Sequence, residues 1–181
     1  MKPPANLDRC RSFIRCQISA PSEGAAKAAK PRKLAVTISR LAGSGAWLVA
    51  EHLAQFLEEH APAEGCRWTV FDKELVEKVL EDHNLPRKLA QFMPEDRVSA
   101  VQDMMQEILG LHPPSWTLAH QTIETILKLG ELGHVIVIGR GANIVTAKLP
   151  HILHVRVVGS LEKRIARVQE RLKLDRKVAA E

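Results

Sequence analysis

The fold is decided by the stretch LAVTISRLAGSGA, which spans residues 34–46. Its first five residues are apolar or β-branched, which is typical of a short, buried parallel strand. Residues 46–60 follow with apolar side chains at helical spacing, as expected of an amphipathic helix. A strand and a helix are therefore joined directly by a short turn that contains Gly43, Ser44 and Gly45.

Strand and helix patterns continue to alternate along the rest of the chain. The predicted strands are residues 34–38, 68–71, 134–138 and 152–158. The predicted helices are residues 46–60, 73–82, a short one from Pro86, 94–109, 116–131, 142–147 and 161–173. Such alternation predicts an α/β domain built on a parallel sheet with right-handed crossovers.

The glycine-containing turn has the features of a phosphate-binding site. The first amides of the following helix lack partners within the helix, and the helix dipole adds partial positive charge there. Glycines let the backbone approach phosphate oxygens, and Ser44 adds a hydroxyl donor. The match to G-x-x-x-x-G-K-[ST] is incomplete, because Ala46 replaces the lysine and Trp47 replaces the Ser or Thr. The alternative is a tight turn that needs glycine only for packing.

Length and composition fit one globular domain. The chain has 181 residues, of which 45% are hydrophobic and 26% are charged. The net charge of +5 comes from residues 1–33, where eight basic residues face two acidic ones; residues 34–181 hold 18 basic and 19 acidic residues. We therefore expect a basic, disordered leader at 1–33, a near-neutral domain at 34–181, and no nucleic-acid partner. No long apolar run indicates a membrane span or a secretory signal, so a cytoplasmic protein without a membrane partner is expected.

The cysteines and histidines predict neither a metal site nor a disulfide framework. Cys10, Cys16 and Cys66 form an odd set without C-x-x-C spacing. We expect free thiols in a reducing cytoplasm. The eight histidines form no close cluster with carboxylates, so no metal ligands are assigned.

Four short motifs in order resemble the cytidylate kinase-like family, a branch of the P-loop nucleoside monophosphate kinases. That family begins with I-S-R-x-x-G-S-G-G after a strand, and residues 38–46 read ISRLAGSGA. FDKELV at 71–76 and VIGRGA at 137–142 resemble the next two motifs. VRV at 155–157 and RIARV at 164–168 resemble the following strand and helix, so that the resemblance spans about residues 34–175.

The resemblance implies a P-loop NTPase-type, three-layer α/β/α fold with a helical insertion at residues 86–132. The implied activity is transfer of a phosphoryl group from ATP, with Mg²⁺, to a nucleoside monophosphate, CMP by the name of the family. Nucleotides would be the partners. The apolar character of the 86–132 segment also leaves a homodimer face as a weaker alternative.

The residues of the turn are the implied ATP phosphate-binding set. They are Ser39, Arg40, Gly43, Ser44, Gly45 and Ala46. Backbone amides would wrap the triphosphate, and Arg40 would supply the cationic charge that the missing lysine does not. The alternative for Arg40 is an ordinary surface arginine.

Two further residues follow predicted strands and are implied to bind the acceptor. Asp72 would accept a hydrogen bond from the base or sugar, and Arg140, between two glycines, would clamp the monophosphate with its guanidinium fork. A helix N-cap is the alternative for Asp72, and a structural ion pair is the alternative for Arg140.

The implied catalytic residues lie on the last predicted helix. Arg164, Arg167 and Arg171 share one face, and Arg167 and Arg171 are the candidates for closing over the transferring phosphoryl group. A solvated basic face is the alternative. Family members continue with a lid, another strand and a closing helix, whereas residues 175–181 resemble only the start of that lid. The expectation is a domain that lacks most of the lid, and the alternative function is a catalytically impaired nucleotide-binding or regulatory module.

Overall fold

The computed structural model describes residues 9, 12–16, 33–60, 66–72, 101–106, 108 and 117–180. In chain order the elements are β1 (Ala35–Arg40), α2 (Ala46–His60), β2 (Thr69–Phe71), α6 (Thr117–Leu132), β3 (Val135–Ile138), α7 (Ala142–Val145), β4 (Ile152–Val157), α8 (Leu161–Leu172) and α9 (Arg176–Ala180). Residues 12–16 and 101–106 are also helical. The predicted helices at 73–82 and near Pro86 lie outside the described residues.

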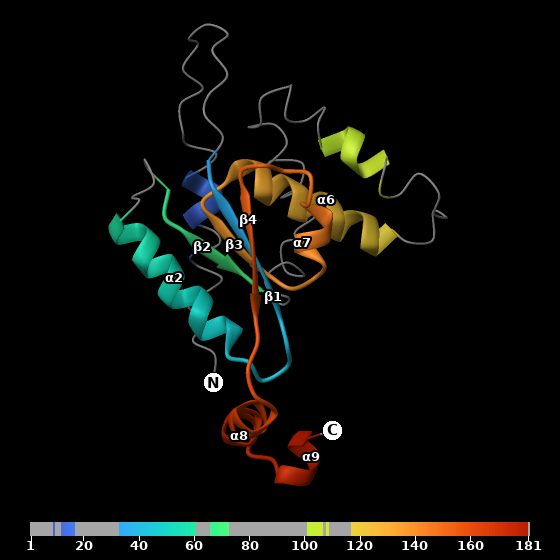
Figure 1. Cartoon of the computed structure of the whole chain (residues 1–181). Helices are drawn as coiled ribbons and strands as arrows, with labels where there is room; N and C mark the ends of the chain where they lie inside the picture. Colours follow the sequence, from blue (N-terminus) through green and yellow to red (C-terminus); the bar gives the residue numbers. More distant parts are fainter. Residues whose placement is uncertain are drawn as a thin grey trace, which may run out of the picture.

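The four strands form one parallel sheet in the order β2-β3-β1-β4 (Figure 1). Ile38 of β1 lies level with Ile138 of β3 and with Val155 of β4. Phe71, the last residue of β2, lies level with Val137. The predicted α/β class with a parallel sheet is therefore confirmed, and the carboxyl ends of β1, β2 and β3 meet at one edge of the sheet.

Helix α2 covers one face of this sheet. Its buried residues, Ala46, Ala50 and Ala54, recur every four residues and so share one side of the helix. Because alanine side chains are short, the helix lies close to the strands. These three alanines pack on the sheet residues Val36, Ile38, Val70, Ile136 and Ile138.

Helices α6 and α7 cover the opposite face, which completes the three layers (Figure 1). Ile126, Leu127 and Leu129 of α6 are fully buried with Val135 and Val137 of β3. Residues 117–132 of the expected helical insertion are thus a layer of the core. Met104 and Met105, from the same expected insertion, also pack against this cluster.

A short piece of the N-terminal region belongs to the same core. Phe13 and Ile14 are 2% and 5% exposed, and the Phe13 ring meets the Phe71 ring edge to face at 5.8 Å. The expectation of a leader without a core is therefore wrong for residues 12–16. Its composition hid this, because two adjacent apolar residues between arginines do not form a recognisable helical pattern.

The expectation of free thiols is wrong for two of the three cysteines. Cys16 and Cys66 form a disulfide, with Cα atoms 5.7 Å apart and a separation of 50 positions in the chain. Docking of Phe13 and Ile14 brings Cys16 to the segment that leads into β2. Sequence spacing gave no sign of this contact, because it depends on long-range packing. Cys10 lies outside the described residues.

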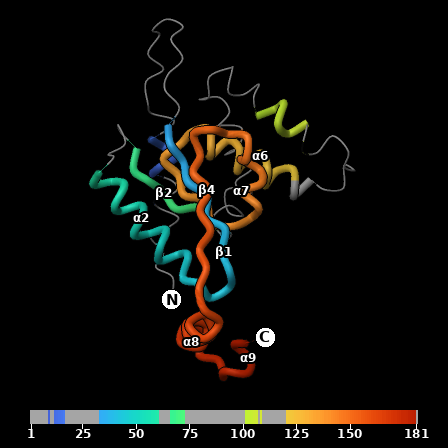
Figure 2. Tube along the Cα trace, in the orientation of Figure 1, coloured from blue at the N-terminus to red at the C-terminus, as the bar shows by residue number. Residues whose placement is uncertain are grey.

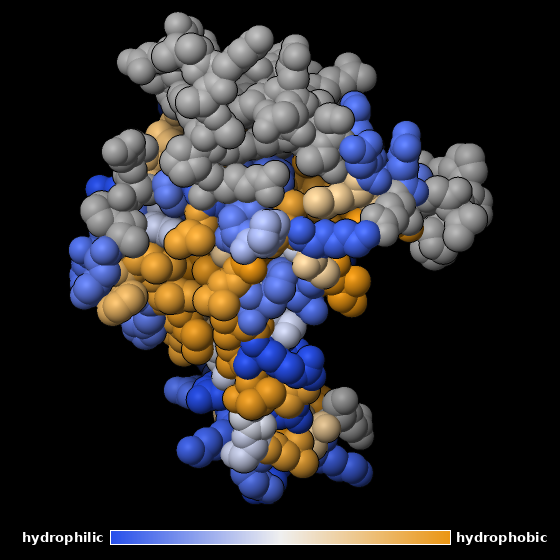
Figure 3. Space-filling view, turned by 45° about the horizontal axis from the view of Figure 1, so that its top comes forward, coloured by the Kyte–Doolittle hydropathy of each residue, from blue (hydrophilic) through white to orange (hydrophobic). Residues whose placement is uncertain are grey.

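The C-terminal helices lie beyond the carboxyl edge of the sheet rather than on either face (Figure 2). Arg176 of α9 pairs with Glu162 of α8 at 2.6 Å. Strand β4 is an edge strand, and Leu153, Val158, Leu161, Leu172 and Val178 are each more than half exposed. Figure 3 shows a broad apolar area in the middle of the visible face. Smaller apolar patches lie among the charged side chains of the C-terminal helices at the bottom.

Among the helices that the structure describes, none combines the length and the apolar character needed to cross a membrane.

Candidate nucleotide-binding site

The candidate site lies where the chain leaves β1 and β3 toward opposite faces of the sheet. Helix α2 follows β1 on one face, and α7 follows β3 on the other. In open α/β sheets, ligands bind outside the carboxyl ends of the strands at such a switch point. Because Ile38 and Ile138 are level, Arg40 and Arg140 each stand two residues beyond the same row of the sheet.

The turn between β1 and α2 is tight and contains a buried hydroxyl group. Gly43 and Gly45 have φ angles of 71° and 81°, a left-handed region that side chains rarely allow. The Ser44 amide donates to the carbonyl of Leu41 at 3.2 Å. Ser44 is 7% exposed, and its Oγ atom makes no hydrogen bond to any residue that the structure describes. An unpartnered buried hydroxyl is costly, and a phosphate oxygen is one group that would satisfy it.

Helix α8 packs directly against this turn. A Cβ atom at Gly43 would lie 2.6 Å from the backbone oxygen of Arg164, so only glycine fits there. The Nη1 atom of Arg167 donates to the carbonyl oxygens of Gly43 and Ser44 at 3.2 and 3.0 Å. Its guanidinium also lies 3.4 Å from where a Cβ of Gly45 would stand. The structure therefore places a fixed positive charge beside the turn, where the sequence lacks the usual lysine.

Arg171, the second catalytic candidate, stands one helical turn beyond Arg167. It is exposed, and in the described part of the chain no hydrogen bond joins it to the turn. Arg167 is thus brought to the turn, whereas Arg171 is not.

Arg40 reaches across the sheet edge to the turn after β3. A Cβ atom at Gly139, where φ is 76°, would lie 2.1 Å from the Nη1 atom of Arg40. The guanidinium of Arg40 therefore lies on Gly139, next to Arg140 in the chain. Ser39 points elsewhere: its hydroxyl donates to the carbonyl of Val155 at 3.4 Å and so joins β1 to β4.

Arg140 is held in a conformation that its residue type disfavours. Gly139, Arg140 and Gly141 have consecutive φ angles of 76°, 55° and 67°. A non-glycine residue in the left-handed region costs of order 1 kcal/mol and tends to occur at functional sites. Arg140 is exposed at this edge of the sheet.

Asp72 stands directly after β2 at the same edge and is 8% exposed. A carboxylate so deeply placed requires compensating contacts. The N-cap alternative concerns the helix expected at 73–82, which lies outside the described residues.

The residues at the turn suit phosphate better than they suit a metal held by protein alone. In the described ranges, no group of three or more His, Cys, Asp or Glu side chains gathers as a metal site. Mg²⁺ in nucleotide enzymes commonly takes most ligands from phosphate and water, so a single hydroxyl can suffice. Ser44 Oγ is the buried oxygen donor that the turn offers.

Sequence reasoning missed two contributors to this site. Arg164 supports the turn through its backbone rather than its side chain. Gly139 provides the surface on which Arg40 rests. The only signal in the sequence was the G-R-G motif itself. It indicates that another group packs closely against Gly139 but does not identify that group as Arg40.

Comparison with known proteins places the chain in a recognised group. A model of the cytidylate kinase-like family matches residues 35–181. No curated protein matches the chain. Among solved structures, the chain is similar to an uncharacterized protein from Eubacterium ventriosum ATCC 27560, with a TM-score of 0.46 and 21% sequence identity. That match covers 81% of this chain and 66% of the other, so the chain spans just under two thirds of its length.

Proposed function

The chain belongs to the cytidylate kinase-like family, and from this premise we propose that it transfers the γ-phosphoryl group of ATP to a nucleoside monophosphate, with CMP as the first acceptor to test. One observation carries the proposal. The guanidinium of Arg167 is hydrogen-bonded to the turn at the switch point of a parallel sheet, and the buried Ser44 hydroxyl of that turn has no partner within the described part of the chain.

In this proposal the turn from Arg40 to Ala46 holds the phosphates of ATP. Amides at the start of α2 and the Ser44 hydroxyl donate to phosphate oxygens. Arg167 supplies the positive charge that Ala46 cannot, since charged hydrogen bonds are about twice as strong as neutral ones. Phosphoryl transfer depends mainly on positioning and on neutralising charge, so these groups are of the kind that the reaction needs.

The acceptor would lie at the ends of β2 and β3. Arg140 offers a planar fork suited to a monophosphate, and the two flanking glycines leave room for close approach. Asp72 is buried at the adjoining strand end, where a carboxylate can accept hydrogen bonds from a base or sugar. Arg40 belongs to the proposed ATP turn, and its guanidinium lies on Gly139, next to Arg140 in the chain.

Magnesium, where bound to the nucleotide, would neutralise charge on the transferring phosphate. Because Trp47 occupies the position of the usual Ser or Thr ligand, the ligand we assign to magnesium is the oxygen of the Ser44 hydroxyl, whose hydrogen can still donate to phosphate. Arg171 would reach the transferring group only if α8 moves, since Arg167 is the arginine that the turn now engages.

A coupled assay of ATP consumption with CMP, UMP, AMP and GMP tests the activity. We expect turnover that depends on the monophosphate and that falls when Arg167 is replaced by alanine. Absence of turnover with all four acceptors, together with absence of nucleotide binding, would overturn the proposal.

A second candidate function is nucleotide binding without turnover. Ala46 and Trp47 favour it, because they remove the side chains that usually hold the β- and γ-phosphates and magnesium. Binding of ATP by calorimetry without consumption in the coupled assay would select this alternative.

We further propose that nucleotides are the binding partners of the protein and that it acts in the cytoplasm. Nucleic acid and membranes are not proposed as partners, because residues 34–181 carry 18 basic against 19 acidic residues. A homodimer is a further proposal, which size measurement in solution tests.

A further inference from the structure

The Cys16–Cys66 disulfide joins a short N-terminal segment to the segment that leads into β2. Residues 12–16 of this segment are helical, as is Arg9. Phe13 and Ile14 of this segment are buried, and the Arg9 guanidinium pairs with Glu51 of α2 at 3.0 Å. The Arg9 side chain of this ion pair is 59% exposed, so solvent weakens the pair, whereas the Glu51 side chain is 22% exposed. The disulfide therefore adds a covalent restraint to a segment that covers part of the core.

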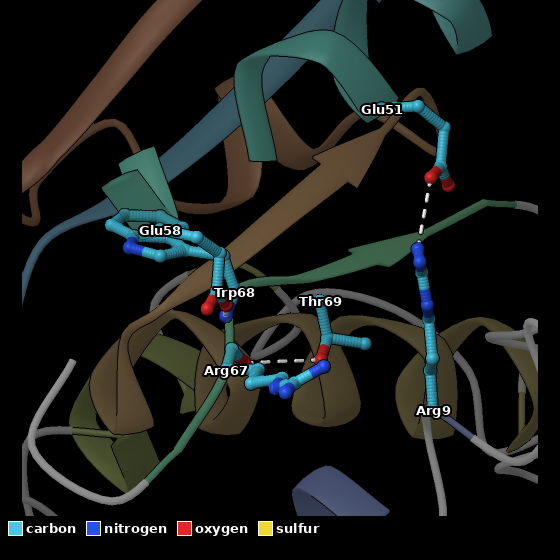
Figure 4. A network of polar contacts seen from close by, with 6 residues as sticks. All are labelled: Arg9, Glu51, Glu58, Arg67, Trp68 and Thr69. Carbon is cyan, nitrogen blue, oxygen red and sulfur yellow. Dashed lines mark hydrogen bonds and ion pairs between the residues drawn. The ribbon is translucent and has the colours of Figure 1, made fainter. Parts of the chain in front are cut away.

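A cleft of about 870 Å³ has Cys16, one of the two bonded cysteines, in its lining. It is lined by residues of α2, of the segment entering β2 and of the N-terminal piece, including Cys16, Arg9, Glu51, Glu58 and Arg67. Figure 4 shows this region, with Arg9 reaching Glu51 and with Glu58 beside the Trp68 amide that donates to it. Cys16 is partly exposed, whereas Cys66 is 3% exposed.

We propose that Cys16 and Cys66 are a reversible thiol–disulfide couple, attacked at Cys16 from this cleft by a small thiol or dithiol, whose oxidised form clamps residues 12–16 against β2. The thiolate of the reductant attacks the Cys16 sulfur, the Cys16–Cys66 bond breaks, and Cys66 leaves as a thiolate that takes a proton. A second thiol attacks the sulfur of the reductant in the mixed disulfide and releases Cys16. Two electrons and two protons pass to the protein, and the reductant leaves as its own disulfide.

The clamp acts on the strand that ends at the proposed acceptor site. Phe13 packs on Phe71, and Asp72 is the next residue after Phe71. Loss of the clamp removes the cover from Phe71 and loosens the end of β2. This consequence for the acceptor rests on the proposed function, whereas the couple itself does not.

Thiol counting on the full chain tests the couple without any nucleotide. The protein is equilibrated with oxidised and reduced glutathione at stepped ratios, alkylated, and weighed by mass spectrometry. Of its three cysteines, we expect one to react in the oxidised form and all three in the reduced form. Cys10→Ser is the matched control and should give zero and two. Reaction of all three cysteines at every ratio, or a disulfide that includes Cys10, overturns the proposal.

Two further measurements test the clamp. Reduction should lower the Tm by about 5–15 °C and speed tryptic cleavage after Arg15 at least about tenfold. Cys16→Ser should behave as the reduced protein and should not respond to dithiothreitol. An unchanged Tm and an unchanged cleavage rate after full reduction would overturn the clamp.

Once turnover is established, steady-state kinetics test the link between the clamp and Asp72. Reduction should raise the KM for the monophosphate and leave the KM for ATP within about twofold. Equal changes in both KM values would contradict the link.

Discussion

The Nη1 atom of Arg167 donates a 3.0 Å hydrogen bond to the backbone carbonyl of Ser44, although 122 residues lie between them in the chain. The same atom bonds the carbonyl of Gly43 at 3.2 Å. A cation from α8 is thus fixed to the turn that opens α2. This relationship supplies the charge that the turn sequence lacks, and it leads to the first prediction.

Arg167→Ala should weaken ATP binding by about 1.5–3 kcal/mol, the usual contribution of a charged hydrogen bond. Isothermal titration calorimetry with ATP measures it. Lys163→Ala is the control, because it removes the same charge from an exposed position on the same helix. Equal losses in the two variants would mean that only the net charge matters and not the contact with the turn.

Gly43→Ala should destabilise the fold more than Gly141→Ala does. Both positions have similar left-handed φ angles, 71° and 67°, so both substitutions carry a similar backbone cost. A methyl group at Gly43 meets the Arg164 backbone at 2.6 Å, whereas nothing lies within 4 Å at Gly141. We expect the free energy of unfolding in urea to fall further for Gly43→Ala by about 1–3 kcal/mol, the cost of overpacking. Matching values would show that α8 is free to move off the turn.

Arg140→Ala should weaken monophosphate binding by about 1.5–3 kcal/mol and leave ATP binding unchanged, because the fork is assigned to the acceptor alone. Arg140→Lys keeps the charge but loses the planar fork, so its affinity for the monophosphate should lie between those of the wild type and Arg140→Ala. Calorimetry with CMP and with ATP separates these effects. Unchanged acceptor affinity in Arg140→Ala would remove Arg140 from the site.

His134 should make the fold less stable in acid. Burial, with a smaller contribution from the nearby positive charge of Lys33, lowers the pKa of His134 below its ordinary value of 6.5. The unfolded chain therefore binds a proton more readily than the folded one, and stability falls as the pH drops below about 6.5 until the lowered pKa is passed. Urea unfolding at pH 7.5 and 5.5 measures the loss. His134→Asn, which tolerates the φ of 55° at this position, should show a smaller loss. An equal loss in wild type and variant would assign the acid sensitivity to other groups.

Local sequence pattern predicted the parts of the fold that depend on short-range rules. The apolar run before the turn became β1, and α2 spans residues 46–60 as predicted. The larger apolar side chains did not mark its buried face, because Ala46, Ala50 and Ala54 are buried whereas Leu48, Val49 and Phe56 are exposed. The rule that parallel strands end at one edge correctly gathered Arg40, Asp72 and Arg140. Their roles stay predictions.

The remainder depends on contacts that no local pattern contains. Phe13 and Ile14 are only two apolar residues, so the helix that buries them could not be recognised. The Cys16–Cys66 pair follows from that docking and from nothing in the spacing. The packing of Arg164 on Gly43 depends on where α8 begins after β4, and that position is set by the assembled sheet.

The central claim is that the turn from Arg40 to Ala46 binds the phosphates of a nucleotide, and amide NMR on the ¹⁵N-labelled full chain tests it most directly. Titration with ATP should shift the amide signals of Ser44, Gly45 and Ala46 first and furthest, and Arg167→Ala should weaken the response. Shifts confined to other residues, or none at millimolar ATP, would contradict the claim.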